Sequence, residues 1–160
     1  MTEIQILPAC INDAREILNI QKLAFKSEAE IHQDFTISPL NQTLISIQDD
    51  FSSYQFYKAL VSRRIVAAVK VKLQDDTLSI GRLVVRPEYQ SRGIGKQMMH
   101  FIENLYKEVK EFELFTAEKS ERNTSFYKGL GYSISERYIE PGHENIILVK
   151  FIKANKAAAE

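Results

Sequence analysis

One stretch of the chain, residues 83–96, constrains the fold more than any other. It reads Leu-Val-Val-Arg-Pro-Glu-Tyr-Gln-Ser-Arg-Gly-Ile-Gly-Lys. The apolar start is typical of a strand, which must stop before Pro87 because proline cannot donate to a sheet ladder. After the loop, apolar residues return at helical spacing: Ile94, Met98, Phe101, Ile102, Leu105 and Val109. The chain therefore has to pass from a strand into a helix through a short loop.

The loop between this strand and this helix has the composition of an anion site. Gly93 and Gly95 let the backbone turn tightly and come close to a ligand. The first N–H groups of a helix are unpaired and lie at the positive end of its dipole. Arg92 and Lys96 add positive charge. The sequence therefore predicts that this loop binds phosphate.

Two well-known phosphate loops do not fit the spacing. In a Walker loop, Gly-Lys is followed by Ser or Thr, but Lys96 is followed by Gln97. A dinucleotide fingerprint requires a third glycine at the position of Met98. What remains is Gln-x-x-Gly-x-Gly after a Val-Val-x-Pro turn.

This pattern resembles the signature loop of the GNAT superfamily of N-acetyltransferases, Gln/Arg-x-x-Gly-x-Gly/Ala. In that family the loop holds the pyrophosphate of acetyl-CoA. The resemblance covers nearly the whole chain and is strongest over residues 80–132. It implies that the pyrophosphate contacts come from seven consecutive residues: Gln90, Ser91, Arg92, Gly93, Ile94, Gly95 and Lys96.

In the strand before the loop, the residues expected to face the core switch from even-numbered to odd-numbered positions. Leu78 and Ile80 place even positions inward, whereas Leu83 and Val85 place odd positions inward. Such a change requires an extra residue, so the pattern predicts a β-bulge between Gly81 and Leu83. The GNAT fold has a bulge in this strand, beside which the pantetheine arm docks like an additional strand. The resemblance therefore adds three backbone contacts to the cofactor: Leu83, Val84 and Val85.

A second segment, residues 120–132, resembles the GNAT segment that ends in Phe-Tyr-x-x-x-Gly-Phe. The family tyrosine that acts as general acid at the CoA sulfur corresponds to Tyr127. A phenol with a pKa near 10 is protonated at neutral pH and can hydrogen-bond a departing thiolate. Many relatives have an asparagine seven residues earlier that contacts CoA. Here that position is Ser120, and Asn123, one turn later, is an alternative contact.

The general base has no single candidate. An amine acceptor is mostly ammonium at pH 7 and must lose a proton before it attacks. Residues 77–85 contain no acid, although family members often place the base on that strand or the one beside it. A water relay fits the sequence as well as any of five side chains: Glu28, Glu30, Glu113, His143 and Glu144.

Composition narrows the class of protein. The 160 residues include equal numbers of basic and acidic side chains, 21 each, so no overall field attracts nucleic acid or an anionic membrane. The single Cys10 excludes an internal disulfide framework, and the first residues have no apolar signal core. No run approaches the roughly 20 apolar residues of a membrane span. No His/Cys/Asp cluster has metal-ligand spacing. We expect a cytoplasmic protein that needs no metal.

The pattern of elements predicts one α/β domain over residues 1–153, followed by a frayed C-terminal tail over residues 154–160. Its order is the GNAT order, which implies a mixed, mostly antiparallel sheet of about seven strands flanked by about four helices. Helical spacing covers residues 13–25 and again 38–50, with a loop or broken helix over residues 26–37 between them.

The expected activity is transfer of acetyl from acetyl-CoA, a co-substrate, to a primary amine by direct attack in a ternary complex. The acceptor is a small molecule or a peptide. Four acids in the flanking loops, Glu28, Glu30, Asp34 and Glu144, suit a cationic amine. The alternative is a CoA-binding sensor or partner-binding module without turnover. Homodimers are common in the family. The sequence does not indicate which length of acyl chain the protein prefers.

Overall fold

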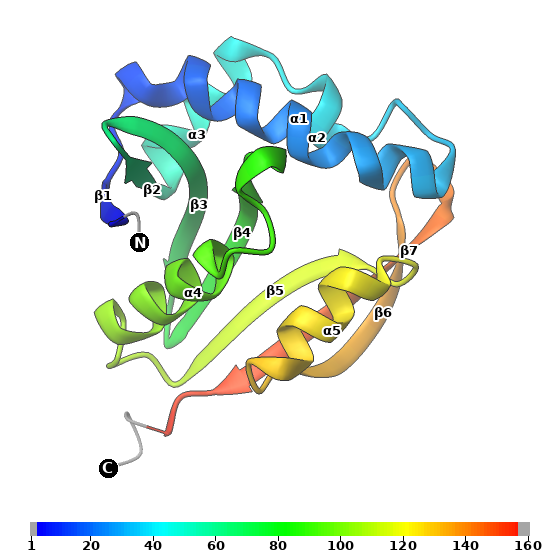
Figure 1. The fold of residues 1–160 in the computed structure, drawn as a ribbon. Helices are drawn as coiled ribbons and strands as arrows, with labels where there is room; N and C mark the ends of the chain where they lie inside the picture. Colours follow the sequence, from blue (N-terminus) through cyan, green and yellow to red (C-terminus); the bar gives the residue numbers. More distant parts are fainter. Residues whose placement is uncertain (1–2, 157–160) are drawn as a thin grey trace.

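The computed structural model describes residues 3–156, whose seven strands form one mixed sheet (Figure 1). The strand order is β1-β2-β3-β4-β5-β7-β6, and every neighbouring pair is antiparallel except β4 and β5. The predicted mixed, mostly antiparallel sheet is confirmed. The strands are β1 (Gln5–Pro8), β2 (Gln55–Val61), β3 (Arg64–Gln74), β4 (Thr77–Val85), β5 (Glu111–Ala117), β6 (Ser133–Glu140) and β7 (His143–Ala154).

Helices cover both faces of this sheet (Figure 1). One face packs against α4 and α5 through a core that includes Met98, Ile102 and Phe112. The other packs against α1 and α3 through a core that includes Ile17 and Ile47. The helices are α1 (Ala14–His32), α2 (Ser38–Asn41), α3 (Leu44–Ser53), α4 (Ile94–Leu105) and α5 (Glu121–Gly129), with short 3-10 turns η1 (Ile11–Asp13) and η2 (Pro87–Tyr89).

The first helix is longer than the sequence predicted. Helix α1 continues seven residues beyond Phe25 to His32, through the segment expected to be a loop or a broken helix. Its buried side continues through Ala29 and His32, at helical spacing from Phe25. The polar residues between them hide this short stripe in the sequence. The extension carries Glu28 on a regular helix.

The expected helix over residues 38–50 is divided into α2 and α3. Gln42 has an extended backbone between them, with φ −62° and ψ 132°. The Thr43 side chain then accepts a hydrogen bond from the Ser46 N–H at 3.1 Å and caps α3. This break explains why five α-helices are found among the described residues where about four were expected.

The β-bulge lies where the sequence placed it. Gly81 pairs with Lys70 and Val84 with Ala68, so two residues of β4, Arg82 and Leu83, oppose one residue of β3. Before the bulge, Leu78 and Ile80 belong to the core under α4 and α5. After it, Val84 belongs to the opposite core. The extra residue thus exchanges the faces of the strand.

The gap between β4 and β5 is the feature of the sheet that creates room for a site. The two strands pair only from Thr77 to Ser79 on β4, opposite Glu111 to Glu113 on β5. Beyond Ser79 they splay apart, and the carboxyl half of β4 has no neighbour on that edge (Figure 1).

The last part of the expected tail, residues 157–160, lies outside the described residues. Ala154 is the final residue of β7, and the Asn155 N–H donates to the Lys110 carbonyl at 2.9 Å.

Candidate active site

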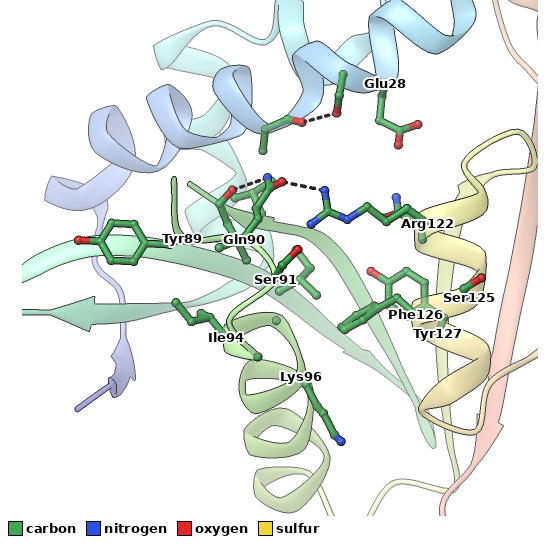
Figure 2. Close-up of a pocket in the computed structure, with 18 of the residues that line it drawn as sticks. Glu28, Tyr89, Gln90, Ser91, Ile94, Lys96, Arg122, Ser125, Phe126 and Tyr127 are labelled. Carbon is green, nitrogen blue, oxygen red and sulfur yellow. Dashed lines mark hydrogen bonds between the residues drawn. The ribbon is translucent and has the colours of Figure 1, made fainter. Parts of the chain in front are cut away.

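A cavity of about 600 Å3 opens where β4 separates from β5 (Figure 2). The bulged end of β4, the loop after it and the start of α4 form one side. Helix α5 forms the other side, and α1 lies across the top. The segments that the sequence singled out, residues 83–96 and 120–132, therefore meet at one cavity. The volume is within the roughly 300–1,000 Å3 of ligand pockets.

The start of α4 presents unpaired N–H groups to this cavity. Gly93 is the N-cap residue, with φ +81°, and no side chain caps the helix. The first bond across the N-cap runs from the Gln97 N–H to the Gly93 carbonyl at 3.0 Å. The N–H groups of Ile94, Gly95 and Lys96 precede it, and these residues line the cavity. Such a helix start attracts an anion through its N–H groups and its dipole.

Glycine at position 95 permits close packing of α5 against the loop. A Cβ atom there would lie 3.3 Å from the tip of the Phe126 ring and 3.9 Å from Leu83. Both side chains line the cavity. The two sequence segments are thus in direct contact, and Gly95 sets how closely they approach.

Gln90 links the bulged strand to α5. Its Nε2 donates to the Val85 carbonyl at 3.0 Å, and its Oε1 accepts from Arg122 Nη1 at 2.8 Å (Figure 2). Arg122 lines the cavity and brings a positive charge to it. Nothing in the sequence singles out Arg122, because it is one basic residue on a short helix.

Most of the predicted cofactor contacts line the cavity, and two do not. Arg92 lies outside the lining, with its guanidinium 5.2 Å from the centre of the Tyr89 ring. Ser120 is 1% exposed and faces α1 instead. The predicted residues in the lining are Leu83, Val84, Val85, Gln90, Ser91, Gly93, Ile94, Gly95, Lys96, Asn123 and Tyr127.

Tyr127, on α5, is one of the residues that line the cavity. Its half-buried ring packs edge-on against Phe126 and Tyr132, at centroid distances of 5.0 and 6.0 Å. Among residues 3–156 no group hydrogen-bonds its hydroxyl. Burial raises the pKa of the Tyr127 phenol, so it keeps its proton at neutral pH. The site therefore holds a neutral, available O–H donor in a largely apolar setting.

A second cavity of about 460 Å3 continues from the first, on the side of α2 and β6. Five residues line both cavities and so mark the junction: Phe25, Glu28, Leu83, Asn123 and Tyr127. Molecules bound in the two cavities would therefore meet at these five residues, which include Tyr127. This arrangement suits a transfer reaction between two substrates.

Glu28 is the acid at this junction. Its Oε1 accepts a hydrogen bond from the Ser120 hydroxyl at 2.7 Å. The bond joins residues 92 positions apart and orients the carboxylate from the side of α5. Ser120, expected to contact CoA, thus holds an acidic side chain between the two cavities.

The other four base candidates lie elsewhere. Glu30 and Glu144 are exposed and line neither cavity. Glu113 pairs with Lys150 at 3.2 Å, and His143 Nδ1 lies 2.7 Å from Asp34. Of the five side chains that the sequence offered, Glu28 is the one placed at the junction.

His32 is a polar group of the second cavity that the sequence did not indicate. Its Nδ1 lies 2.9 Å from the Glu28 carbonyl. Because that oxygen can only accept, Nδ1 carries the proton in the neutral ring, and Nε2 is left as an acceptor. Nε2 is buried and has no hydrogen-bond partner among the described residues.

Solved structures with the same fold include N-acetyltransferases. The ribosomal-protein-S18-alanine N-acetyltransferase of Escherichia coli has a TM-score of 0.75 at 13% identity, and the alignment covers 96% of this chain and 94% of that one. The PaiA N-acetyltransferase of Thermoplasma acidophilum, solved with coenzyme A, has a TM-score of 0.70 at 18% identity over 92% and 98% of the two chains. The fold is therefore that of the N-acetyltransferases.

The sequence profile of the acetyltransferase (GNAT) family matches residues 14–132, and the chain belongs to this family. Two proteins of Bacillus subtilis (strain 168) are related in sequence. UPF0157 protein YqkA is 28% identical over 123 residues, which are 77% of this chain but 35% of YqkA. The uncharacterized protein YyaT is 24% identical over 149 residues, 86% of this chain and 99% of YyaT. The chain thus spans about a third of one relative and nearly all of the other.

Two features of other protein classes are absent from residues 3–156. No helix in this part of the chain is long and apolar enough to cross a membrane. Within the same residues, no group of three or more His, Cys, Asp or Glu side chains could hold a metal ion.

Proposed function

We propose that the chain transfers an acetyl group from acetyl-CoA to a primary amine, by direct attack within a ternary complex. The observation that carries this proposal is the junction of the two cavities at Tyr127 and Glu28. Acetyl-CoA would occupy the cavity at the start of α4, and the acceptor would occupy the second cavity. Membership of the acetyltransferase (GNAT) family supports the acetyl donor.

The proposed cofactor contacts follow from the geometry of the first cavity. The N–H groups at the start of α4, with Lys96 and Arg122, would hold the pyrophosphate. The unpaired edge of β4 from Leu83 to Val85 would align the pantetheine arm. Backbone donors on this edge would also polarise the thioester carbonyl. Gln90, Ser91, Gly93, Ile94 and Gly95 would complete the lining around the pyrophosphate, and Asn123 lies at the junction of the two cavities.

The proposed mechanism assigns one proton transfer to Glu28 and one contact to Tyr127. Glu28 accepts a proton from the ammonium, and the free amine attacks the thioester carbon. The C–S bond then breaks, and the sulfur leaves with the electron pair. Tyr127 hydrogen-bonds the developing thiolate, which ends as the CoA thiol after taking the second proton lost by nitrogen. The products are an N-acetyl amide and CoA.

A thiol-release assay with acetyl-CoA and a panel of amines tests this proposal. Tyr127→Phe removes one hydrogen bond to a charged group, worth about 1.5–3 kcal/mol, so turnover should fall by about 10- to 150-fold. CoA affinity, measured by calorimetry, should change little. Tyr138→Phe is the matched control, because Tyr138 is exposed on β6 and lines neither cavity.

Three outcomes separate the alternatives. Turnover that falls in Tyr127→Phe but not in Tyr138→Phe supports the enzyme and the role of its phenol. Tight CoA binding without turnover on any amine would favour a sensor or partner-binding module. No CoA binding at all would refute the assignment of the first cavity.

A further inference from the structure

Two positively charged side chains, Lys70 and Arg82, line the second cavity, and they differ in whether a carboxylate pairs with them. Lys70 Nζ lies 3.1 Å from Asp50 Oδ2 and 4.2 Å from the centre of the Tyr54 ring. Its charge is therefore paired. Arg82 also lines the cavity, but no carboxylate of the described residues is within ion-pair distance of its guanidinium.

The hydrogen bonds of Arg82 are also incomplete. Nη2 donates to the Ser38 hydroxyl at 3.3 Å, and Nη1 is buried with no partner in residues 3–156. Burial lowers the pKa of the guanidinium, and Asp50 and Glu140 offset only part of that effect at longer range. Arginine nevertheless stays charged at neutral pH. A partly buried cation without an ion pair is costly, and an anionic ligand would remove that cost.

The β-bulge directs Arg82 into this cavity. Arg82 is one of the two bulge residues and has φ +51°, in the left-handed region that non-glycine residues rarely adopt. Its guanidinium lies against α1 and α2, 6.0 Å from the centre of the Phe25 ring and in contact with Ser38. The irregularity that bends β4 thus also places a cation without an ion pair among the described residues in the second cavity, the proposed acceptor site.

Charged side chains of both signs line the second cavity: Glu28 and Glu140 are acidic, and Lys70 and Arg82 are basic. Glu28 lies at the junction with the cofactor cavity, whereas Arg82 lines only the second cavity. A molecule with an ammonium and a carboxylate would match both. The volume of about 460 Å3 is sufficient for a small ligand.

We propose that the acceptor is a small amine that also carries a carboxylate, an amino acid or a close analogue. The Arg82 guanidinium binds the carboxylate, and the amine lies at Glu28 beside Tyr127. The inference rests on the proposed acetyl transfer and narrows its substrate class. A planar guanidinium suits a carboxylate because it can form two parallel hydrogen bonds.

The test compares each amino acid with its carboxamide in the thiol-release assay. The panel includes the α-amino acids and acceptors with one or two more methylenes between amine and carboxylate. We expect the wild-type protein to prefer the carboxylate member of the best pair by about tenfold or more in kcat/KM. Arg82→Gln should lower kcat/KM for that carboxylate by about 10- to 100-fold and change its carboxamide less than threefold.

Two further variants keep the test selective. Arg82→Lys retains the charge but loses the planar pair of donors, so its kcat/KM should lie between those of the wild type and Arg82→Gln. Arg64→Gln is the control, because Arg64 is exposed, forms an ion pair with Glu88 at 3.7 Å and lines neither cavity. It should leave the preference unchanged. If Arg82→Gln does not fold, the preference of the wild type and of Arg82→Lys decides the question.

The outcomes distinguish this inference from the proposed function. Wild-type turnover on carboxamides or simple amines that equals or exceeds turnover on amino acids would overturn the inference and leave acetyl transfer standing. If CoA binds but no amine is acetylated, amino acid binding to the CoA-loaded protein is measured by calorimetry. Binding that is lost in Arg82→Gln would support the carboxylate site, and no binding to the wild type would refute it.

Discussion

Glu28→Gln is the change that tests the chemistry of the junction most directly. Glutamine has the size of glutamate, and its amide oxygen can still accept the hydrogen bond that the Ser120 hydroxyl donates at 2.7 Å. The side chain should keep its position between the cavities. The midpoint of thermal unfolding should therefore stay within about 2 °C of the wild type. The variant removes the ability to accept a proton and little else.

The expected loss of rate follows from the protonation state of the acceptor. At pH 7 an amine is mostly ammonium, and a positioned base contributes about 100- to 10,000-fold. We expect kcat/KM of Glu28→Gln to fall by that factor at pH 7, which corresponds to about 3–5 kcal/mol in the barrier. The deficit should shrink as the pH rises through the pKa of the amine, because the acceptor then arrives already deprotonated. The assay is thiol release from acetyl-CoA between pH 6.5 and 9.5.

The matched control is Glu30→Gln, two residues further along α1, at an exposed position that lines neither cavity. It removes the same charge from the same helix and should change kcat/KM less than twofold. A Glu28→Gln enzyme that keeps more than a third of the wild-type rate at pH 7 would refute the role of Glu28 and favour a water relay. A deficit that is the same at every pH would instead indicate a role in acceptor binding.

Two other predictions concern stability. Gly93→Ala should lower the free energy of unfolding by about 1–2 kcal/mol, because φ is +81° at this position. Gly129→Ala is the control and should cause no loss, because Gly129 lies outside the left-handed region and has equally open surroundings. Equal thermal unfolding midpoints for the two variants would contradict this account. Hydrogen bonds from Thr36 hold the pKa of Asp34 at about 2, below its ordinary value of 3.8. The stability that this carboxylate adds is present above about pH 4 and lost as the pH falls towards 2. Asp34→Asn should therefore be less stable than the wild type at pH 7, and the difference should disappear in acid denaturation between pH 4 and pH 2; a difference that persists at pH 2 would argue against this source of stability.

The parts of the fold that were predicted correctly depend on neighbours in the sequence. The change of parity between Ile80 and Leu83 located the bulge, because side chains in a strand alternate with a period of two. Proline and glycine fixed the end of β4 and the start of α4. The end of α1 was predicted wrongly because it depends on contacts with residues that are distant in the sequence. Ala29 and His32 are buried by α2 and the last hairpin, which a local pattern does not include.

The sequence by itself determined the local geometry of this protein, namely the bulged strand, the loop and the helix start, because each depends on backbone preferences of consecutive residues. Only the tertiary structure decided which polar side chains meet. Glu28 reaches Ser120 across 92 residues, and the bulge turns Arg82 towards Ser38 on α2. Both contacts join elements that are distant in the sequence, next to the gap where β4 and β5 separate after three paired residues, so no pattern of neighbouring residues predicts them.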